Sequence, residues 1–297
     1  MGKRLSRNAL VGYPAGIVTG VTYGLNPLFA VPLMRDGASI SAILFFRYAL
    51  AVCILGVWLY VGRTRISVSW KQAGVLFALG VLYTCSSAFL FEAYGYIASG
   101  VATTLVFLYP VLVAVVMAFL GVVPSWKVWC AIVATFIGVV VMTQGGEVHR
   151  MNPIGIVLSV ASALSYSFFI IIINRSRMIA DISNTLLTFY ALIVGAIFFL
   201  FRVLWTGHSV TDGIDGTWAW FCLLGLALLP TIVSTASLAI ATRNIGATKA
   251  SVLGVFEPVT AILVGTLVFG EPLTVNVLLG IGISMAAVIF MIMFTKR

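Results

Sequence analysis

Long apolar runs, separated only by short polar clusters, recur along the whole chain and constrain its fold more than any other feature. Hydrophobic residues make up 62% of the sequence, charged residues make up 8%, and the mean hydropathy is +1.16. An ordinary water-soluble domain has about a quarter of its residues charged. So few charges cannot cover a surface in contact with water, and the sequence therefore predicts an all-α membrane protein whose helices cross the bilayer repeatedly.

Ten apolar runs approach or exceed the roughly 20 residues that a helix needs to cross the hydrocarbon core. Five precede the polar segment of residues 144–152 and five follow it. The predicted spans are residues 10–32, 39–61, 72–94, 97–121, 126–143, 153–174, 183–204, 217–241, 247–268 and 273–294. The first run is longer than an ordinary signal-peptide core and has no clear cleavage site, so we expect it to be retained as a helix.

Lys and Arg are distributed unevenly between the two sets of loops. If the amino terminus is cytoplasmic, thirteen of them lie in cytoplasmic segments and only Arg35, Arg150 and Arg202 lie in external segments. Cytoplasmic loops carry the excess of positive charge in membrane proteins. The count predicts a protein of the cell inner membrane with both termini in the cytoplasm, and adding or removing one span would invert every later loop.

Several other classes of function lack a sequence signal. The net charge of +9 does not indicate nucleic acid, because the 17 Lys and Arg are scattered at the ends of apolar runs. The four cysteines lie inside apolar runs and form no cluster with His149 or His208, so neither a disulfide nor a metal site is expected. No HExxH, GxSxG or phosphate-binding glycine loop is present, and we therefore expect neither an enzyme nor a cofactor.

The two halves of the sequence resemble each other. At a fixed offset of 148 positions, five residues recur identically: Ile97, Ala102, Pro110, Val111 and Pro124 return as Ile245, Ala250, Pro258, Val259 and Pro272. We therefore predict two five-helix repeats, residues 1–145 and residues 146–297. Because each repeat contains an odd number of spans, the second is inverted relative to the first, as in transporters that open a central site alternately to either side.

Small residues form a stripe along one helix of each predicted repeat. The two stripes are Gly12, Gly16, Gly20 and Gly24, and Gly155, Ser159, Ala163 and Ser167. Small residues at a spacing of four allow the backbones of membrane helices to approach closely. The stripes predict close helix contacts, and the sequence leaves open whether these contacts are static or take part in a movement.

Two segments carry a resemblance to a known family. Residues 91–111 (FEAYGYIASGVATTLVFLYPV) and residues 243–259 (RNIGATKASVLGVFEPV), the latter followed by Phe269-Gly-Glu-Pro, are similar to corresponding parts of the drug/metabolite transporter superfamily, EamA type. The resemblance implies ten helices, cytoplasmic termini and a substrate cavity between the halves. The chain departs from it at Val123-Pro124, where a Glu-Pro or Gly-Glu pair is often found.

Three charged residues stand out because of their depth. Arg47 lies well inside the second predicted span and Glu257 well inside the ninth, next to Pro258. A charge at that depth costs at least about 2.5–3.5 kcal/mol unless it is paired or hydrated. We expect Arg47 to pair with Glu257 or with Glu92 of the third span, and the sequence does not choose between these carboxylates.

These charges have two interpretations. A salt bridge would merely fix the packing of the helices. Alternatively, Arg47 binds a substrate carboxylate while Glu257 or Glu92 binds a cationic group or a coupling proton, an arrangement that would suit an amino acid. Aromatic and small polar side chains are candidates to line the same cavity: Tyr23, Asn26, Tyr83, Tyr94, Tyr109, Tyr166, Tyr190, Ser234 and Thr235. Asn26 is the best of them, because Pro27 frees a backbone carbonyl beside it.

The sequence thus favours a secondary transporter of small metabolites that works by alternating access. Export of amino acids or related compounds is the leading hypothesis, with multidrug or organic-cation efflux, metabolite uptake and a non-transport membrane role as alternatives. The expected partners are a small-molecule substrate, membrane lipid and a proton if transport is coupled. The ten helices can satisfy one another within one chain, so we expect a monomer.

Overall fold

The computed structural model describes residues 7–63, 66–122, 125–143, 152–207, 209–246, 250 and 252–294, and every regular element within these ranges is a helix. Several residues used above lie outside the described ranges: Lys3, Arg4, Arg65, Val123, Pro124, His149, Arg150, His208, Lys249, Lys296 and Arg297.

The helices follow the predicted spans closely. Before the polar segment they are α1 (Arg7–Gly24), α2 (Asn26–Arg35), α3 (Ile40–Val61), α4 (Trp70–Ala93), α5 (Ser99–Val106), α6 (Tyr109–Phe119) and α7 (Trp126–Thr143). After it they are α8 (Pro153–Arg175), a short 3₁₀ helix η1 (Arg177–Ile179), α9 (Asn184–Trp205), α10 (Gly216–Leu226), a π-helical segment η2 (Ala227–Val233), α11 (Ser234–Ile245), α13 (Phe256–Phe269) and α14 (Val275–Phe294). Several predicted spans are therefore broken into two or more helices.

Length and hydropathy make most of these helices suitable for a bilayer. Within the described residues, eight helical stretches are long and apolar enough to cross a membrane, and Trp126–Val141 and Phe256–Phe269 are shorter apolar helices. The prediction of an all-helical membrane protein is confirmed. The two shorter helices coincide with the predicted spans at residues 126–143 and 247–268.

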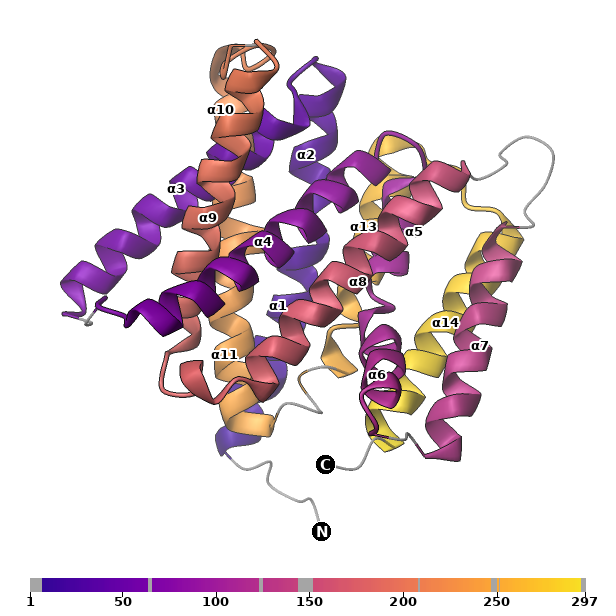
Figure 1. Ribbon diagram of the computed structural model, residues 1–297. Coiled ribbons are helices and arrows are strands. Elements are labelled where there is room, and N and C mark those ends of the chain that lie inside the picture. The colour runs from indigo at the N-terminus through magenta and orange to yellow at the C-terminus, as the bar shows by residue number, and fades with distance from the viewer. Residues whose placement is uncertain are drawn as a thin grey trace.

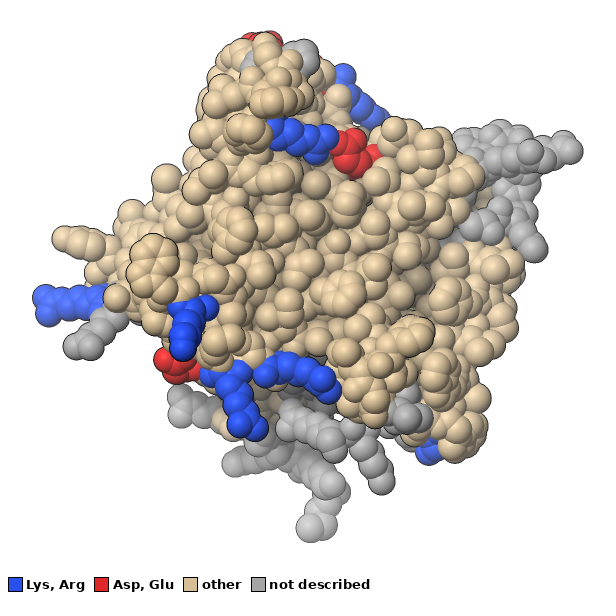
Figure 2. All heavy atoms as spheres, viewed as in Figure 1, with Lys and Arg blue, Asp and Glu red and all other residues tan. Residues whose placement is uncertain are grey.

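One face of the molecule carries an uncharged belt between two charged ends. Figure 2 shows that, on the visible face, the charged side chains lie toward the upper and lower ends of the molecule, with an uncharged surface between them. Several tryptophans near helix ends are strongly exposed, including Trp70 at 94%, Trp126 at 71% and Trp205 at 79%. Tryptophan is enriched where a bilayer meets water, so this surface matches that of a membrane-embedded bundle.

Many helix contacts join the part of the chain before the polar segment to the part after it. Helix α1 packs against α11, η2 and α13, and α8 packs against α4, α5 and α6. Helix α3 pairs with α9, α5 pairs with α13, and α7 pairs with α14 at one edge of the bundle (Figure 1, right). Every one of these contacts joins a helix that precedes the polar segment to a helix that follows it.

The predicted glycine stripe of α1 lies at a close helix contact. A Cβ atom added to Gly20 would lie 2.9 Å from Phe256 Cβ and 3.0 Å from the Leu253 carbonyl oxygen, and one added to Gly24 would meet the Glu257 carbonyl. In the second stripe, a Cβ on Gly155 would lie 2.7 Å from a methyl carbon of Ile97. Both stripes thus bring the backbone of one half against the other half, as small residues in membrane helices allow.

We expect Gly20→Ala to destabilise the protein and Gly74→Ala to leave it unchanged or slightly more stable. The added methyl group at residue 20 is forced against Phe256, an overpacking that costs about 1–3 kcal/mol. Gly74 lies in α4 with open space around it, and Ala favours the helix there. Thermal unfolding of the two purified variants in detergent tests this contrast, and equal stability would show that the α1 contact tolerates a side chain.

Candidate functional site

Proline residues break three of the spans near the middle of the bundle. The breaks fall at Leu25 before Pro27, at residues 107–108 before Pro110, and at residues 254–255 before Pro258. Proline lacks an amide donor and clashes with the preceding turn, so it frees the carbonyl four residues earlier. Inside a bilayer, such a carbonyl must find its donor within the protein.

Asn26 supplies the missing donor at the first break. Its amide nitrogen donates a hydrogen bond of 2.8 Å to the Tyr23 carbonyl, which is the group that Pro27 leaves without its helical partner. Asn26 is buried, with 2% of its surface exposed. The prediction that Pro27 frees a carbonyl in this span therefore has a specific outcome: the side chain of the preceding residue satisfies it.

Thr231 plays the same role in the eighth span, where Pro230 lies within the π-helical segment η2. The Thr231 hydroxyl donates to the carbonyl of Leu226, four residues before Pro230, at 3.0 Å. π-Helical turns inside α-helices are rare and occur often at functional sites. The Thr231 hydroxyl also accepts a hydrogen bond from a charged residue of the first half of the chain.

Arg47 of α3 is this charged residue. Its side chain is buried, with 1% of its surface exposed, and its Nε donates a hydrogen bond of 3.0 Å to the Thr231 hydroxyl. The guanidinium carbon lies 5.6 Å from the centre of the Phe91 ring and 5.8 Å from that of Tyr48. Aromatic faces attract a cation, and this attraction is stronger where water is excluded.

Two polar atoms of this region have no partner within the described part of the chain. They are Nη2 of Arg47, a donor, and Oδ1 of Asn26, an acceptor. A buried polar atom without a partner costs about 1–3 kcal/mol, and more when it belongs to a charged group. Because native proteins rarely leave such atoms unpaired, they indicate where a bound polar molecule or water would be accommodated.

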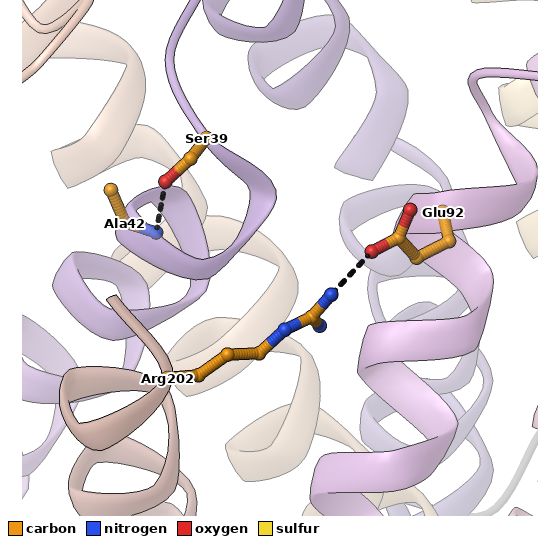
Figure 3. A network of polar contacts seen from close by, with 4 residues as sticks. All are labelled: Ser39, Ala42, Glu92 and Arg202. Carbon is orange, nitrogen blue, oxygen red and sulfur yellow. Dashed lines mark hydrogen bonds and ion pairs between the residues drawn. The ribbon is translucent and has the colours of Figure 1, made fainter. Parts of the chain in front are cut away.

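The predicted ion pair between Arg47 and a carboxylate is not present among the described residues. Glu92 of α4 instead accepts from Arg202 Nη2 of α9 at 2.9 Å, and both side chains are partly exposed (Figure 3). Arg202 had been expected only as an external charge. Since its guanidinium neutralises Glu92, the expected competition between Glu92 and Glu257 for Arg47 does not arise.

Glu257 lies near the start of α13, beside the third proline break. Within the described ranges its carboxylate forms no ion pair, and no hydrogen bond of its side chain is found. It interacts electrostatically with five tyrosines, all of them predicted site residues: Tyr23, Tyr83, Tyr94, Tyr109 and Tyr166. Arg47 interacts electrostatically with three of the same tyrosines, Tyr23, Tyr83 and Tyr94.

Three of these tyrosines, Tyr83, Tyr109 and Tyr166, come from separate helices and are joined by ring contacts, directly or through Phe169. Tyr83 of α4 and Tyr166 of α8 both pack against Phe169, with ring centres 5.5 and 5.7 Å away, and Tyr166 meets Tyr109 edge to face at 4.9 Å. Tyr94 contacts the Thr103 hydroxyl at 3.2 Å. The cluster therefore spans the first and second halves of the chain.

Most members of the cluster are deep in the bundle and still partly accessible. Tyr23, Tyr94, Tyr109, Tyr166 and Glu257 lie in the interior, yet none of them is fully buried. Side chains with both properties are expected to border an internal space that water can enter. A concave apolar site with a few convergent polar groups is the usual setting for a small ligand.

Three further candidates are occupied by other contacts. The Tyr190 hydroxyl donates to the Ile66 carbonyl, which lies in the segment between α3 and α4, so it serves an end of the bundle. Ser234 donates to the Thr19 carbonyl at 3.2 Å and Thr235 to the Thr231 carbonyl at 2.7 Å. Serine and threonine in helices commonly bond backbone carbonyls in this way.

Sequence reasoning missed Thr231, Tyr48 and Phe91, which hold Arg47. Thr231 carried a usable signal, because a hydroxyl directly after Pro230 in an apolar span is placed to repair the proline break. Tyr48 and Phe91 carried none, since an aromatic residue in such a span is most often simply packed against its neighbours. No group of three or more His, Cys, Asp or Glu that could hold a metal ion occurs in the part of the chain that the structure describes.

Comparison with known proteins now identifies the family. The EamA-like transporter family matches this sequence over residues 10–144 and again over residues 153–293. The chain belongs to the EamA-like transporter family. The two matches together take in all ten predicted spans, and they confirm the resemblance drawn from residues 91–111 and 243–259.

Three relatives of this EamA-like protein are described as uncharacterized transporters. Two come from Archaeoglobus fulgidus: one is 27% identical over 188 residues, covering 63% of this chain and 65% of the relative, and the other is 25% identical over 248 residues, covering 82% and 84%. A third, from Synechocystis sp., is 25% identical over 215 residues, covering 70% and 61%. The matches thus span less than two thirds of the first and third relatives.

A solved crystal structure has the same fold as this EamA-like protein. The two superpose with a TM-score of 0.65 over 94% of this chain and 95% of the other, at 15% sequence identity. At this identity, the likeness concerns the fold alone. The family and the relatives support a multi-pass membrane transporter, without specifying what it carries.

We expect Thr231→Val to destabilise the protein strongly and Thr231→Ser to leave it close to the native stability. Valine has the shape of threonine but leaves the buried Arg47 Nε without its acceptor, which costs about 1–3 kcal/mol. Serine keeps the hydroxyl. Thermal unfolding of both variants measures the difference, and equal stabilities would mean that water replaces the hydroxyl without loss.

Proposed function

We propose that this protein is a secondary transporter that moves small metabolites bearing both a carboxylate and a cationic group, amino acids or related compounds, by alternating access. Arg47 and Glu257 carry the proposal. They are an interior cation and an interior carboxylate that both lie among the same tyrosines, without an ion pair between them. Two such charges would normally be expected to neutralise each other directly.

The proposed mechanism uses two inverted five-helix repeats, residues 1–145 and 146–297. If the repeats are equivalent, the packing of α1 against α11 and α13 corresponds to the packing of α8 against α4 and the α5–α6 pair, and both sets occur. The separate family matches to residues 10–144 and 153–293 and the offset of 148 positions support the same division. Inverted repeats can exchange conformations, which opens the central site to each side in turn.

The proposed orientation places both termini in the cytoplasm and the protein in the inner membrane of the cell. The excess of Lys and Arg on one set of loops supports this orientation. We further propose that the monomer is the functional unit, that membrane lipid surrounds it, and that export is the direction of transport. If transport is coupled, Glu257 would bind a proton from water in alternation with the substrate's cationic group, whereas facilitated diffusion would need no such group.

The substrate is proposed to bind between the two charges. Its carboxylate would accept from Arg47 Nη2, the donor that has no partner, in a charge-assisted hydrogen bond. Its cationic group would lie beside Glu257 and the surrounding tyrosine rings, which attract cations as well. Asn26 Oδ1, the unpaired acceptor, is a further candidate to receive an N–H group from the substrate.

Efflux of organic cations is the second candidate. A carboxylate without a cationic partner, which interacts electrostatically with Tyr23, Tyr83, Tyr94, Tyr109 and Tyr166, is also what a site for a bare cation would contain. The two candidates differ in their need for Arg47: an amino acid requires its guanidinium, while an organic cation is repelled by it.

We predict saturable counterflow of amino acids in proteoliposomes that contain the native protein. Arg47→Ala and Glu257→Gln should each lower the exchange rate about 10-fold to 100-fold, because each removes the partner of one substrate charge. The substrate panel should include amino acids, nucleosides, sugars and organic cations. Exchange of organic cations alone, retained or increased in Arg47→Ala, would favour the second candidate.

Glu92→Gln provides the matched control for Glu257→Gln. It makes the same chemical change in a carboxylate that is already paired with Arg202 at a partly exposed position. We expect nearly native counterflow and a loss of stability below about 1 kcal/mol. If no substrate class is exchanged by native protein that is folded and inserted, the transport proposal fails for that panel.

Stability separates function from packing at Glu257. If this carboxylate only held helices together, Glu257→Gln would destabilise the protein, as breaking a buried pair does. We instead expect Glu257→Gln to unfold at the same temperature as the native protein or higher, because an interior carboxyl group without an ion-pair partner makes no contact that the amide would lose. Thermal unfolding in detergent, measured beside counterflow, distinguishes these outcomes.

A further inference from the structure

Glu271 lies in the connection between α13 and α14, and its carboxylate accepts hydrogen bonds from the start of α5. One carboxylate oxygen accepts from the Ser99 amide at 2.8 Å and from the Ser99 hydroxyl at 2.7 Å, and the other accepts from the Gly100 amide at 3.4 Å. The first amides of a helix have no partner within the helix, and the positive end of the helix dipole attracts a carboxylate. Ser99 is buried, with 1% of its surface exposed.

Gly265 of α13 makes room for this carboxylate. A Cβ atom added there would overlap Glu271 Oε2 and would lie 3.3 Å from the Ser99 hydroxyl. Glu271 itself is held in place by its own backbone amide, which donates to the Gly265 carbonyl at 2.9 Å. The contact therefore needs three residue types at once: an acid, a hydroxyl donor and a glycine.

This contact joins the two halves at one end of the bundle. Ser99 and Gly100 belong to the first half, whereas Gly265 and Glu271 belong to the second. In Figure 1 the start of α5 and the end of α13 lie at the upper end, opposite the end marked N and C. A second contact between the two halves involves the end of α13: the Arg35 guanidinium, at the end of α2, lies 5.1 Å from the centre of the Phe269 ring.

The other repeat lacks all three components of the contact. At the offset of 148 positions, Glu271 corresponds to Val123, Gly265 to Met117 and Ser99 to Ala247. Valine cannot accept a hydrogen bond, alanine has no hydroxyl donor, and methionine would fill the space that the glycine leaves open. The sequence thus provides this polar contact for only one of the two equivalent positions.

We infer that Glu271 is a latch that holds the bundle closed at the end opposite the chain termini, and that no equivalent latch holds the other end. The inference rests on the proposed alternating access. Opening at the latched end separates α5 from the α13–α14 connection and breaks all three hydrogen bonds to the carboxylate. The latch therefore biases the resting protein toward the state that is open at the end where the termini lie.

Thiol accessibility tests the latch with two reporters at equivalent positions. Ala102 in α5 and Ala250 in the second half are separated by the repeat offset of 148 and are both buried, at 0% and 3% exposure. Each is replaced by Cys, one at a time, in a full-length chain whose Cys53, Cys85, Cys130 and Cys222 are changed to Ser. The rate of reaction with a water-soluble maleimide is then measured in nanodiscs, where both faces are reachable.

Glu271→Gln should raise the labelling rate of the cysteine at residue 102 at least about fivefold and lower that at residue 250, since it removes a charge-assisted interaction. Gly265→Ala should give the same pair of changes, because its methyl group displaces the carboxylate without altering it. Asp36→Asn, an exposed acid at the end of α2, should change neither rate.

Unchanged labelling at both reporters in folded Glu271→Gln and Gly265→Ala would overturn the latch. Parallel increases at both reporters would also overturn it, because they indicate general loosening and not an exchange of states. The measurement needs no substrate, so its outcome is separate from that of counterflow. Failure of counterflow with reciprocal labelling would leave the latch standing and reject the proposed function alone.

Discussion

Backbone carbonyls freed by proline must find donors inside the protein, because the bilayer offers none, and the centre of this structure is organised by that requirement. Asn26 satisfies the carbonyl beside Pro27, and Thr231 satisfies the one beside Pro230. Thr231 then accepts from Arg47. The breaks that weaken the helices thus also bring polar side chains to the middle of the bundle, where an uninterrupted apolar helix would have none.

The same arrangement couples the two halves. Arg47 belongs to α3 in the first half, and the hydroxyl that holds it belongs to the π-helical segment η2 in the second. A helix with a π-helical turn and a proline has weaker internal hydrogen bonding than a regular helix, and such places are where long helices bend. A ligand that competes with Thr231 for the guanidinium would therefore act directly on the most deformable part of the eighth span.

The sequence predicted the fold well and the interactions of the charged residues poorly, for a physical reason. Apolar length and proline position are properties of single segments, and they located the helices and the break at Pro27. Pairing depends on which helices meet, which no single segment determines. Glu92 seemed as suitable for Arg47 as Glu257, until the packing of α4 against α9 placed Arg202 beside it.

The depth of the tyrosine cluster follows from the same packing. Tyrosine is common at membrane surfaces, so the sequence alone does not show that Tyr83, Tyr109 and Tyr166 lie in the interior. Their ring contacts with Phe169 and with one another place them together with Glu257 in the interior. The hydroxyl group of an interior tyrosine can hydrogen-bond a charge, and fixing the rigid ring costs little conformational entropy. Fixing a long, flexible polar side chain costs more conformational entropy. An interior carboxylate is therefore better supported by such a cluster than by long flexible polar side chains, which are few in the predicted spans.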